Sequence, residues 1–381
     1  MSWLDTIKRH TIYKQFLPTD EDLSNEELKN LAQRLKTDSQ EKNLINILEW
    51  QDRNIKTWSE RWTTASILTN LTIIALFVIS IYFGKINHYL YFLLLFIPFI
   101  ILGNLTLNII FNLIIFLVSV LIIPLVLSTF SPVLNINSSI FLVLIAFSVV
   151  LGSFISLVID LFLKYRGLKS YIPDFDISDT FKLSLPIKKI LHYKLAICRD
   201  YAKLTSALIL TLHPKSEIYF VLIPQHVAVC IKLNNKMYVL DQKLPILTLD
   251  IWKEKWKKQL KKKKLKIDLV KIYLENKKIR CKSVKNDEVL YQHNEINIDE
   301  LNNKIKKLFK INIDRPKKKD NLKIPIKDFV LLISNDEIVK NSLIELIKNR
   351  VEDELVTNIN NLKYIDAERK DKDLIIKVWL K

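Results

Sequence analysis

The stretch LAICRDYAKLTSALILTLHP at residues 195–214 is followed by PQHVAVCIKL at 224–233 and by MYVLDQKLP at 237–245. Apolar residues in the first stretch recur with a period of about 3.6 up to its closing His-Pro pair, which predicts a helix that begins near Cys198. The next two stretches alternate with a period of two, as strands do. The three stretches thus predict a helix followed by two strands.

The length of the turn between the two strands decides whether His226 and Asp241 lie on the same face of the sheet. Asn tolerates the positive φ of tight turns, so Asn234-Asn235 predicts a two-residue turn and an antiparallel hairpin. With that even length, Asp241 lies diagonally beside His226, whereas an odd length would move it to the opposite face. A shared site therefore requires the two-residue turn.

Cys198, His226 and Asp241 form a candidate thiol triad. A thiol becomes a strong nucleophile as a thiolate, and a helix N-terminus and a neighbouring imidazolium both stabilise that anion. The Asp241 carboxylate would hold one imidazole tautomer while the other ring nitrogen faces the thiol. Taken singly, each of the three residues also fits a structural role, since free Cys residues are usually buried in cores.

An acyl-transfer site also needs hydrogen-bond donors for the oxyanion. The backbone N–H of Cys198 is one candidate because amides in the first turn of a helix lack intrahelical partners. His192 and Tyr193 are candidates for a second donor, and packing is the alternative for both. Arg199 and Asp200 are expected to support the helix start rather than to react.

CRDYA at 198–202, the His that opens a strand and YVLD at 238–241 resemble the transglutaminase-like superfamily, which has a papain-like core. The resemblance covers roughly residues 186–250. Ala196 stands where the family commonly has Gly, and Val227 where it commonly has an aromatic residue. Members include cysteine peptidases, amidases, acyl-transfer cross-linkers and inactive forms.

The resemblance implies a thiol hydrolase, a cysteine peptidase or amidase, that acts on peptide or side-chain amides of a protein or peptide substrate. Cys198 would attack the carbonyl carbon, His226 would carry the proton and Asp241 would orient His226. Water as the second nucleophile gives hydrolysis, whereas an amine gives cross-linking. The alternative is a catalytically inactive, membrane-tethered module that binds a peptide or serves as a scaffold. No cofactor is expected in either case.

Four long apolar runs with almost no charge predict membrane-spanning helices, since a span needs about 20 apolar residues. The runs are residues 65–83, 89–106, 107–130 and 140–163. Basic residues flank the first and the last run, which places both termini in the cytoplasm by the positive-inside rule. The expected location is the cell membrane, as a multi-pass protein. No ionisable residue lies mid-run, so we expect an anchor rather than a transporter.

The expected fold class is thus an α-helical four-span membrane bundle plus a cytoplasmic α+β domain of transglutaminase-like type, with a small C-terminal α/β appendage. Residues 26–62 predict a helical segment that packs on the core or on a partner subunit. Near the C-terminus, residues 329–334, 338–355 and 373–380 predict a β-α-β unit. The expected domains are a cytoplasmic helical segment (1–62), a transmembrane region (63–165), a transglutaminase-like core (166–255), a basic extension (256–315) and the appendage (316–381).

The composition of the chain excludes several kinds of site. The three Cys residues have no paired spacing, and the six His residues form no cluster with metal-ligand spacing, so neither a disulfide framework nor a metal site is expected. No Gly follows Gly167, which excludes a P-loop and a dinucleotide-binding fingerprint in the C-terminal part.

Much of the net charge of +18 follows residue 250. WKEKWKKQLKKKKLK, from Trp252 to Lys266, predicts a basic helix with Trp252, Trp256 and Leu260 on one side. Contact with anionic lipids is one interpretation, and a solvated Lys-rich surface is another. Binding of nucleic acid is a third, which the lack of a nucleic-acid motif disfavours. The oligomeric state does not follow from the sequence.

Overall fold

The structure is a computed structural model of the chain. It describes residues 16–58, 165–176, 178–179, 182–224, 226–275, 278–284, 297–311, 316, 321–327, 329, 336–356 and 361–380. The chain divides into two compact units, Met1–Ser59 together with Ser184–Lys381, and Glu60–Leu183. In the second unit, the described residues form a helix at 165–171 and short stretches after it. The first unit, which contains the candidate site, is therefore built from two separate segments of the chain.

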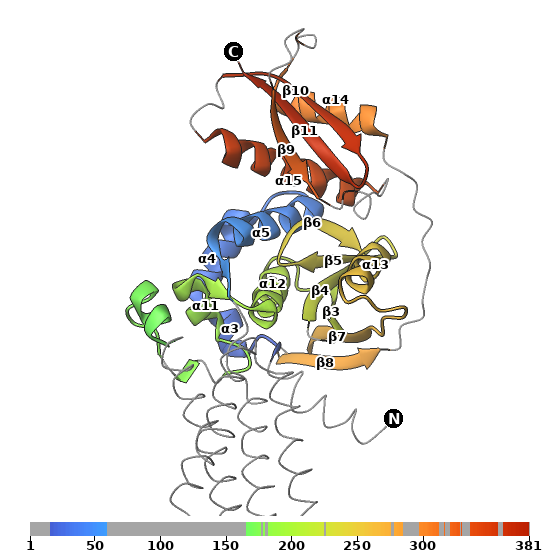
Figure 1. The fold of residues 1–381 in the computed structure, drawn as a ribbon. Helices are drawn as coiled ribbons and strands as arrows, with labels where there is room; N and C mark the ends of the chain where they lie inside the picture. The colour runs from blue at the N-terminus through green and yellow to red at the C-terminus, as the bar shows by residue number, and fades with distance from the viewer. Residues whose placement is uncertain are drawn as a thin grey trace, which may run out of the picture. The chain divides into compact units, whose positions relative to one another are not determined.

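An antiparallel sheet forms the centre of the first unit (Figure 1). In the order in which they lie side by side, its strands are β6 (Lys243–Thr248), β5 (Lys236–Asp241), β4 (His226–Leu233), β3 (Glu217–Ile223), β7 (Asp268–Glu275) and β8 (Lys278–Val284). Five consecutive residues of β4, from Val227 to Ile231, are buried. Both faces of this strand are therefore covered, which explains its nearly continuous apolar sequence.

Helix α12 (Cys198–Leu212) packs against β4 and confirms the predicted helix. All of its residues from Asp200 to Leu210 are buried. A fully buried Leu such as Leu204 or Leu208 contributes roughly 2–3 kcal/mol relative to an exposed one, so this helix is a major part of the core. Pro214 follows two residues after the helix end and prevents its continuation.

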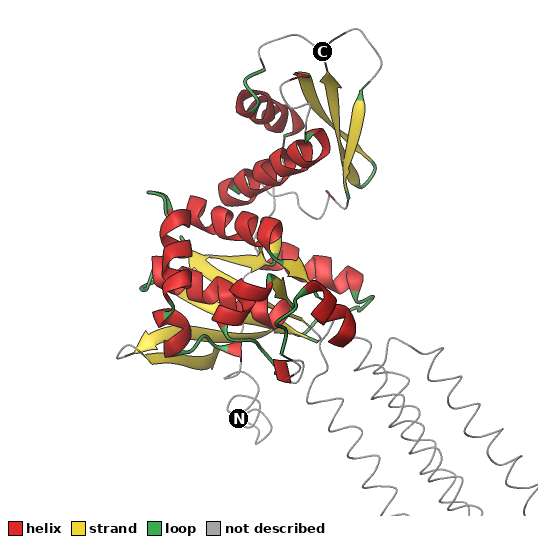
Figure 2. Cartoon of the chain, turned by 90° about the vertical axis from the view of Figure 1, so that its left-hand side faces the viewer, coloured by secondary structure: helices red, strands yellow, loops and turns green. Residues whose placement is uncertain are grey.

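Three N-terminal helices pack against α12, and Figure 2 shows helices gathered over one face of the sheet. They are α3 (Asp20–Ser24), α4 (Glu26–Leu35) and α5 (Gln40–Asn54), capped by the side chains of Thr19, Asn25 and Ser39. Within residues 26–58, the described part of the predicted helical segment 26–62, the chain forms two helices, because it becomes extended at Lys36 and Ser39 starts a new helix. The second helix ends at Asn54, where the chain becomes extended again. Both pack on the core of the first unit.

A short parallel pair of strands lies next to the start of α12. Strand β1 (Lys56–Thr57) pairs with β2 (Leu195–Ala196), which lies between α11 (Ile187–Tyr193) and α12. Strands β1 and β2, which come before and after the second unit in sequence, therefore pair immediately before Cys198.

Helix α13 (Leu249–Gln259) follows β6 directly.

The C-terminal part of the first unit contains a three-stranded antiparallel sheet with the order β10-β11-β9. Its elements are α14 (Ile298–Leu308), β9 (Leu322–Ile326), α15 (Glu337–Leu355), β10 (Leu362–Lys370) and β11 (Asp373–Leu380). Helix α15 and strand β11 confirm the predicted helix and last strand, whereas residues 330–334 lie outside the described residues. Helix α15 packs on β6, where the backbone N–H of Ile246 donates to the Ser342 hydroxyl at 3.1 Å.

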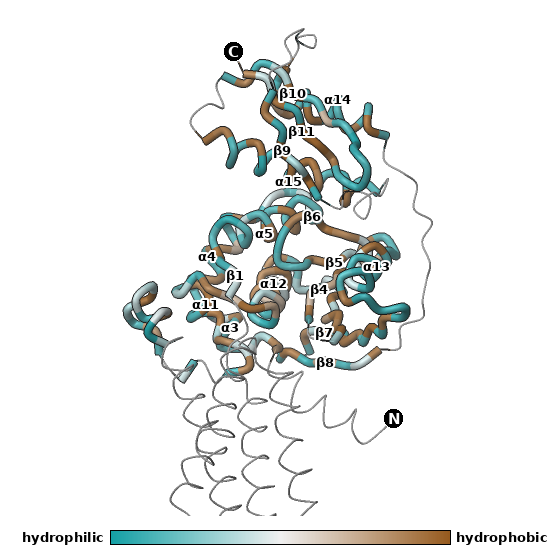
Figure 3. Tube along the Cα trace, viewed as in Figure 1, coloured by the Kyte–Doolittle hydropathy of each residue, from teal (hydrophilic) through white to brown (hydrophobic). Residues whose placement is uncertain are grey.

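The sequence predicts four membrane spans at 65–83, 89–106, 107–130 and 140–163, and all four lie outside the described residues. Across the part of the chain that the structure describes, no helix is both long and apolar enough to cross a bilayer. Figure 3 shows hydrophilic residues recurring along α4, α5 and α14, as expected for helices that cover a core on one side only. The expected fold class, a four-span bundle plus an α+β domain, is therefore corrected to an α+β fold for the described residues. The predicted multi-pass cell-membrane location, with both termini cytoplasmic, is corrected on the same finding.

Candidate active site

Cys198 is the first residue of α12 and is half-buried. The backbone of Ile197 is extended, so the helix begins directly at the Cys. The Asp200 side chain accepts a hydrogen bond from the backbone N–H of Ile197 at 3.2 Å and thereby caps the helix start. The sulfur of Cys198 therefore lies at the positive end of the helix dipole.

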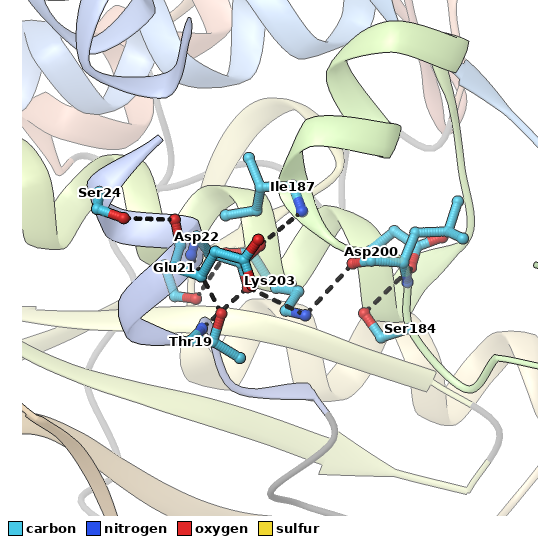
Figure 4. Close-up of polar contacts among 10 residues, drawn as sticks. Thr19, Glu21, Asp22, Ser24, Ser184, Ile187, Asp200 and Lys203 are labelled. Atoms are coloured by element: carbon cyan, nitrogen blue, oxygen red, sulfur yellow. Dashed lines mark hydrogen bonds and ion pairs between the residues drawn. The ribbon is translucent and has the colours of Figure 1, made fainter. Parts of the chain in front are cut away.

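Asp200 also holds the segment that leads toward α12 (Figure 4). Its Oδ1 accepts hydrogen bonds from the backbone N–H of Leu185 at 2.8 Å and from the Ser184 hydroxyl at 3.1 Å. Together with the Ile197 N–H, these donors compensate the complete burial of the carboxylate. The contacts agree with the predicted role of Asp200 at the helix start.

A second pair of contacts anchors the residues before the second unit. The Tyr201 hydroxyl donates to the backbone carbonyl of Ile55 at 2.8 Å, and the backbone N–H of Trp58 donates to the carbonyl of Ala196 at 2.9 Å. Ala196, which stands where the family commonly has Gly, is fully buried. The first turn of α12 is thus fixed from both segments that form the first unit.

A buried ion pair joins α3 to α12 (Figure 4). Lys203 Nζ lies 3.2 Å from Asp22 Oδ2, and both side chains are almost fully buried. Asp22 also accepts the backbone N–H of Ile187 at 2.7 Å, and Lys203 donates to the carbonyl of Leu185 at 3.3 Å. The pair is therefore supplied with the extra hydrogen bonds that a buried ion pair requires.

The turn between β4 and β5 has the predicted length. Leu233 pairs with Lys236, and the pairing continues to Val229 opposite Leu240. Asn234 and Asn235 have φ values of 48° and 62°, the left-handed backbone that a two-residue hairpin turn needs at both positions. The register therefore brings Asp241 to the same face as His226, as the sequence predicts.

His226 contacts both other members of the candidate triad. Its Nε2 lies 2.7 Å from Asp241 Oδ1, and its ring lies near enough to the Cys198 side chain for the two groups to interact. Because His226 Nε2 is hydrogen-bonded to the Asp241 carboxylate, we assign the interaction with the Cys198 thiol to Nδ1. The structure thus brings together the three residues that the sequence singles out.

The electrostatics of the pair favour charged His226 and charged Asp241. Burial alone would lower the pKa of His226, but the hydrogen bonds and charges of Asp241 and Cys198 outweigh it and raise that pKa to about 9. Burial would likewise raise the pKa of Asp241, yet the hydrogen bonds from His226 and Trp252 hold it below its usual value. An imidazolium therefore lies beside the Cys198 thiol at neutral pH.

Two residues of the site, Trp252 and Trp256, were not predicted to belong to it. Both indole N–H groups donate to Asp241 Oδ2, at 2.7 Å and 3.2 Å respectively. The sequence places the two residues on one side of a helix, but it does not indicate what that side contacts. Their spacing of four residues indicates that they share one side of a helix, whereas the neighbouring lysines favour a solvent-exposed side. Lipid contact through Trp252 to Lys266 remains a prediction.

The remaining candidate residues have other surroundings. Cys230 is fully buried in β4, and burial raises the pKa of its thiol. Cys281 lies in the outermost strand, β8. His192 and Tyr193 lie in the last turn of α11, and a role for either as an oxyanion donor remains a prediction. Within the described ranges, no three or more His, Cys, Asp or Glu side chains gather closely enough to hold a metal ion.

Comparisons with known proteins give one family and one curated relative. A family model described as a transglutaminase-like domain matches residues 26–273, from α4 to β7. The chain is similar to UPF0252 protein MJECL39 of Methanocaldococcus jannaschii, with 36% identity over 201 residues. That match covers 52% of this chain and 55% of the relative, so the chain spans about half the length of the curated relative. No solved structure matches the chain.

Proposed function

Because this chain belongs to the transglutaminase-like domain family, we propose that it is a thiol hydrolase that cleaves peptide or side-chain amides of a protein or peptide substrate. Cys198 is the proposed nucleophile, His226 the general base and acid, and Asp241 the residue that orients His226. The observation that supports the proposal most is the hydrogen bond between His226 and Asp241, made by a ring that also interacts with the Cys198 side chain. A Cys that serves only to fill the core needs no such partners.

In the first half of the reaction, Cys198 reacts as a thiolate whose proton His226 already holds on Nδ1. The thiolate attacks the amide carbonyl carbon, a C–S bond forms, and the carbonyl oxygen becomes an oxyanion. The backbone N–H of Cys198 is the proposed oxyanion donor, because it lies at the first residue of α12. The C–N bond then breaks, and the amine leaves with the proton of His226.

In the second half, a water molecule attacks the thioester while His226 accepts its proton. The C–S bond breaks, a carboxylic acid is released, and the Cys198 thiolate beside the protonated His226 is formed again. An amine in place of water would instead form a new amide and make the protein a cross-linker. Hydrolysis and cross-linking share every residue named above, so they are distinguished by products rather than by the site.

A test that needs no known substrate is the rate of Cys198 alkylation by iodoacetamide as a function of pH. The full chain is required, because α3, α4 and α5 pack directly on the helix that carries Cys198. Mass spectrometry locates the modified Cys, and Cys198→Ala and His226→Ala are the informative variants. Cys281→Ala is the matched control, since that Cys lies in the edge strand β8.

We expect Cys198 to react rapidly well below the ordinary thiol pKa of about 8.5, and the His226→Ala variant to lose this low-pH reaction. The Cys281→Ala control should retain it. If Cys198 reacts only as the pH approaches the ordinary thiol value in the folded wild-type protein, the proposal of a thiol hydrolase is wrong, and a non-catalytic peptide-binding module becomes the better proposal.

A further inference from the structure

The Asp241 carboxylate has a second oxygen that does not face His226. This oxygen, Oδ2, accepts hydrogen bonds from the indole N–H of Trp252 at 2.7 Å and of Trp256 at 3.2 Å. The two tryptophans are four positions apart in α13 and therefore lie on the same side of the helix. Both carboxylate oxygens thus have donors, so rotation of the Asp241 side chain would break at least one hydrogen bond.

Trp256 makes a second contact within the site. Its ring stacks on the His226 imidazole, with centroids 4.2 Å apart and an angle of 28° between the planes. Trp252 is fully buried, and its ring centroid lies 6.0 Å from that of Trp256. An aromatic face beside an imidazolium stabilises the positive charge, and a stacked ring also restricts rotation of the imidazole.

The two indole N–H groups supply the hydrogen-bond donors that the buried Asp241 carboxylate needs for its second oxygen. The Asp241 side chain is only 12% exposed, so water offers few alternative donors for its second oxygen. A buried carboxylate without donors takes up a proton or turns toward solvent, and either change would leave His226 without its charged partner.

We infer that Trp252 and Trp256 are positioning residues of this site. Trp252 fixes the Asp241 carboxylate, and Trp256 fixes both the carboxylate and the plane of the His226 ring. The inference rests on the proposed function, because it assigns the two residues a role in keeping the imidazole aligned with the thiol. They act through Asp241 and His226 and need not touch the substrate.

The test measures His226 rather than turnover, so it does not depend on a known substrate. Nuclear magnetic resonance of the full chain with isotope-labelled histidine gives the pKa of His226 and the exchange rate of its ring N–H proton. A His226→Gln variant assigns the signals. Trp252→Phe removes one N–H donor, Trp256→Phe removes the other but keeps a ring for stacking, and Trp256→Leu removes both the donor and the ring.

Trp379→Phe is the matched control, since Trp379 lies in β11, where its ring forms a T-shaped pair with that of Tyr364. Its spectrum should give the wild-type pKa for His226. We expect the ring N–H proton of His226 to exchange roughly tenfold faster in Trp252→Phe and Trp256→Phe, because each loses a hydrogen bond to a charged group. Trp256→Leu should also lower the pKa of His226 by roughly one unit, because the imidazolium loses its stacking partner.

Unchanged exchange and an unchanged His226 pKa in the folded variants would overturn the inference. Trp256 is only half-buried, so Trp256→Phe and Trp256→Leu still test the inference if Trp252→Phe does not fold. If the variants change His226 as expected but wild-type Cys198 shows an ordinary thiol pKa, the positioning role stands and the proposed thiol chemistry fails. If wild-type Cys198 is reactive at low pH but the pKa and proton exchange of His226 are unchanged in the tryptophan variants, the proposed thiol chemistry stands and the positioning role fails.

Discussion

His226 joins two side chains that come from different elements, Asp241 at the end of β5 and Cys198 at the start of α12. Burial works against its positive charge, and the two partners more than compensate for that effect. The interactions of His226 should therefore also be visible in the stability of the protein, because a raised pKa in the folded state means that protonated His226 favours folding.

The stability of the wild-type protein should depend on pH through this residue. Protonated His226 contributes stability that is complete below about pH 6.5 and is lost as the pH rises through about 9, the pKa in the folded state. We expect the free energy of unfolding to fall by on the order of 3 kcal/mol over this interval. In Asp241→Asn the pKa of His226 should return toward its ordinary value, and this fall should largely disappear.

Chemical denaturation at a series of pH values measures both curves. Asp371→Asn, in the exposed turn between β10 and β11, is the matched control and should follow the wild-type curve. Parallel curves for the wild type and Asp241→Asn would show that Asp241 does not support the charge of His226.

At the scale of secondary-structure elements, the hairpin of β4 and β5 shows what local sequence can predict. Its alternating residues and its Asn pair are local signals, and they predict the register that puts Asp241 beside His226. The contacts of α13 could not be predicted in the same way. Its helical period places Trp252 and Trp256 on one side, but the direction of that side depends on β6 and on an irregular pairing near Asp241.

Replacement of Asn234 tests the turn. Its φ of 48° is unfavourable for a β-branched residue, so Asn234→Val should lower the free energy of unfolding by about 1–2 kcal/mol. Asn234→Gly should change stability by only a few tenths of a kcal/mol, since Gly adopts this conformation freely. Chemical denaturation at neutral pH compares the two. Equal stability of the Val and Gly variants would show that the positive φ at this position is not required.

At the scale of the whole molecule, residues 16–58 and 184–284 build one core although more than a hundred residues separate them in sequence. The apolar stripes of α4 and α5 predict that these helices are buried, but not that α12 is their partner. Such long-range pairing depends on how complete elements pack, and the sequence pattern of each element describes only its own faces. Asp22 and Lys203 illustrate this, because nothing local indicates that they pair.

The buried ion pair of Asp22 and Lys203 joins the two segments, and its contribution to the free energy of unfolding can be measured. Lys203→Met leaves Asp22 buried without its cation and should lower the free energy of unfolding by about 3–5 kcal/mol. The double variant with Asp22→Asn should recover part of this loss, because no uncompensated charge remains. A double-mutant cycle by chemical denaturation gives the coupling energy. Additive effects of the two substitutions would mean that the pair does not hold the segments together.

The central proposal is that Cys198 reacts as a thiolate paired with the protonated His226 ring. The most direct measurement is the far-ultraviolet absorbance of the thiolate, taken as the difference between the wild type and Cys198→Ser while the pH is raised. The account predicts that this absorbance is already present at about pH 6 and that His226→Gln removes it. A thiolate that forms only near the ordinary pKa of about 8.5 in the folded wild type would contradict the account.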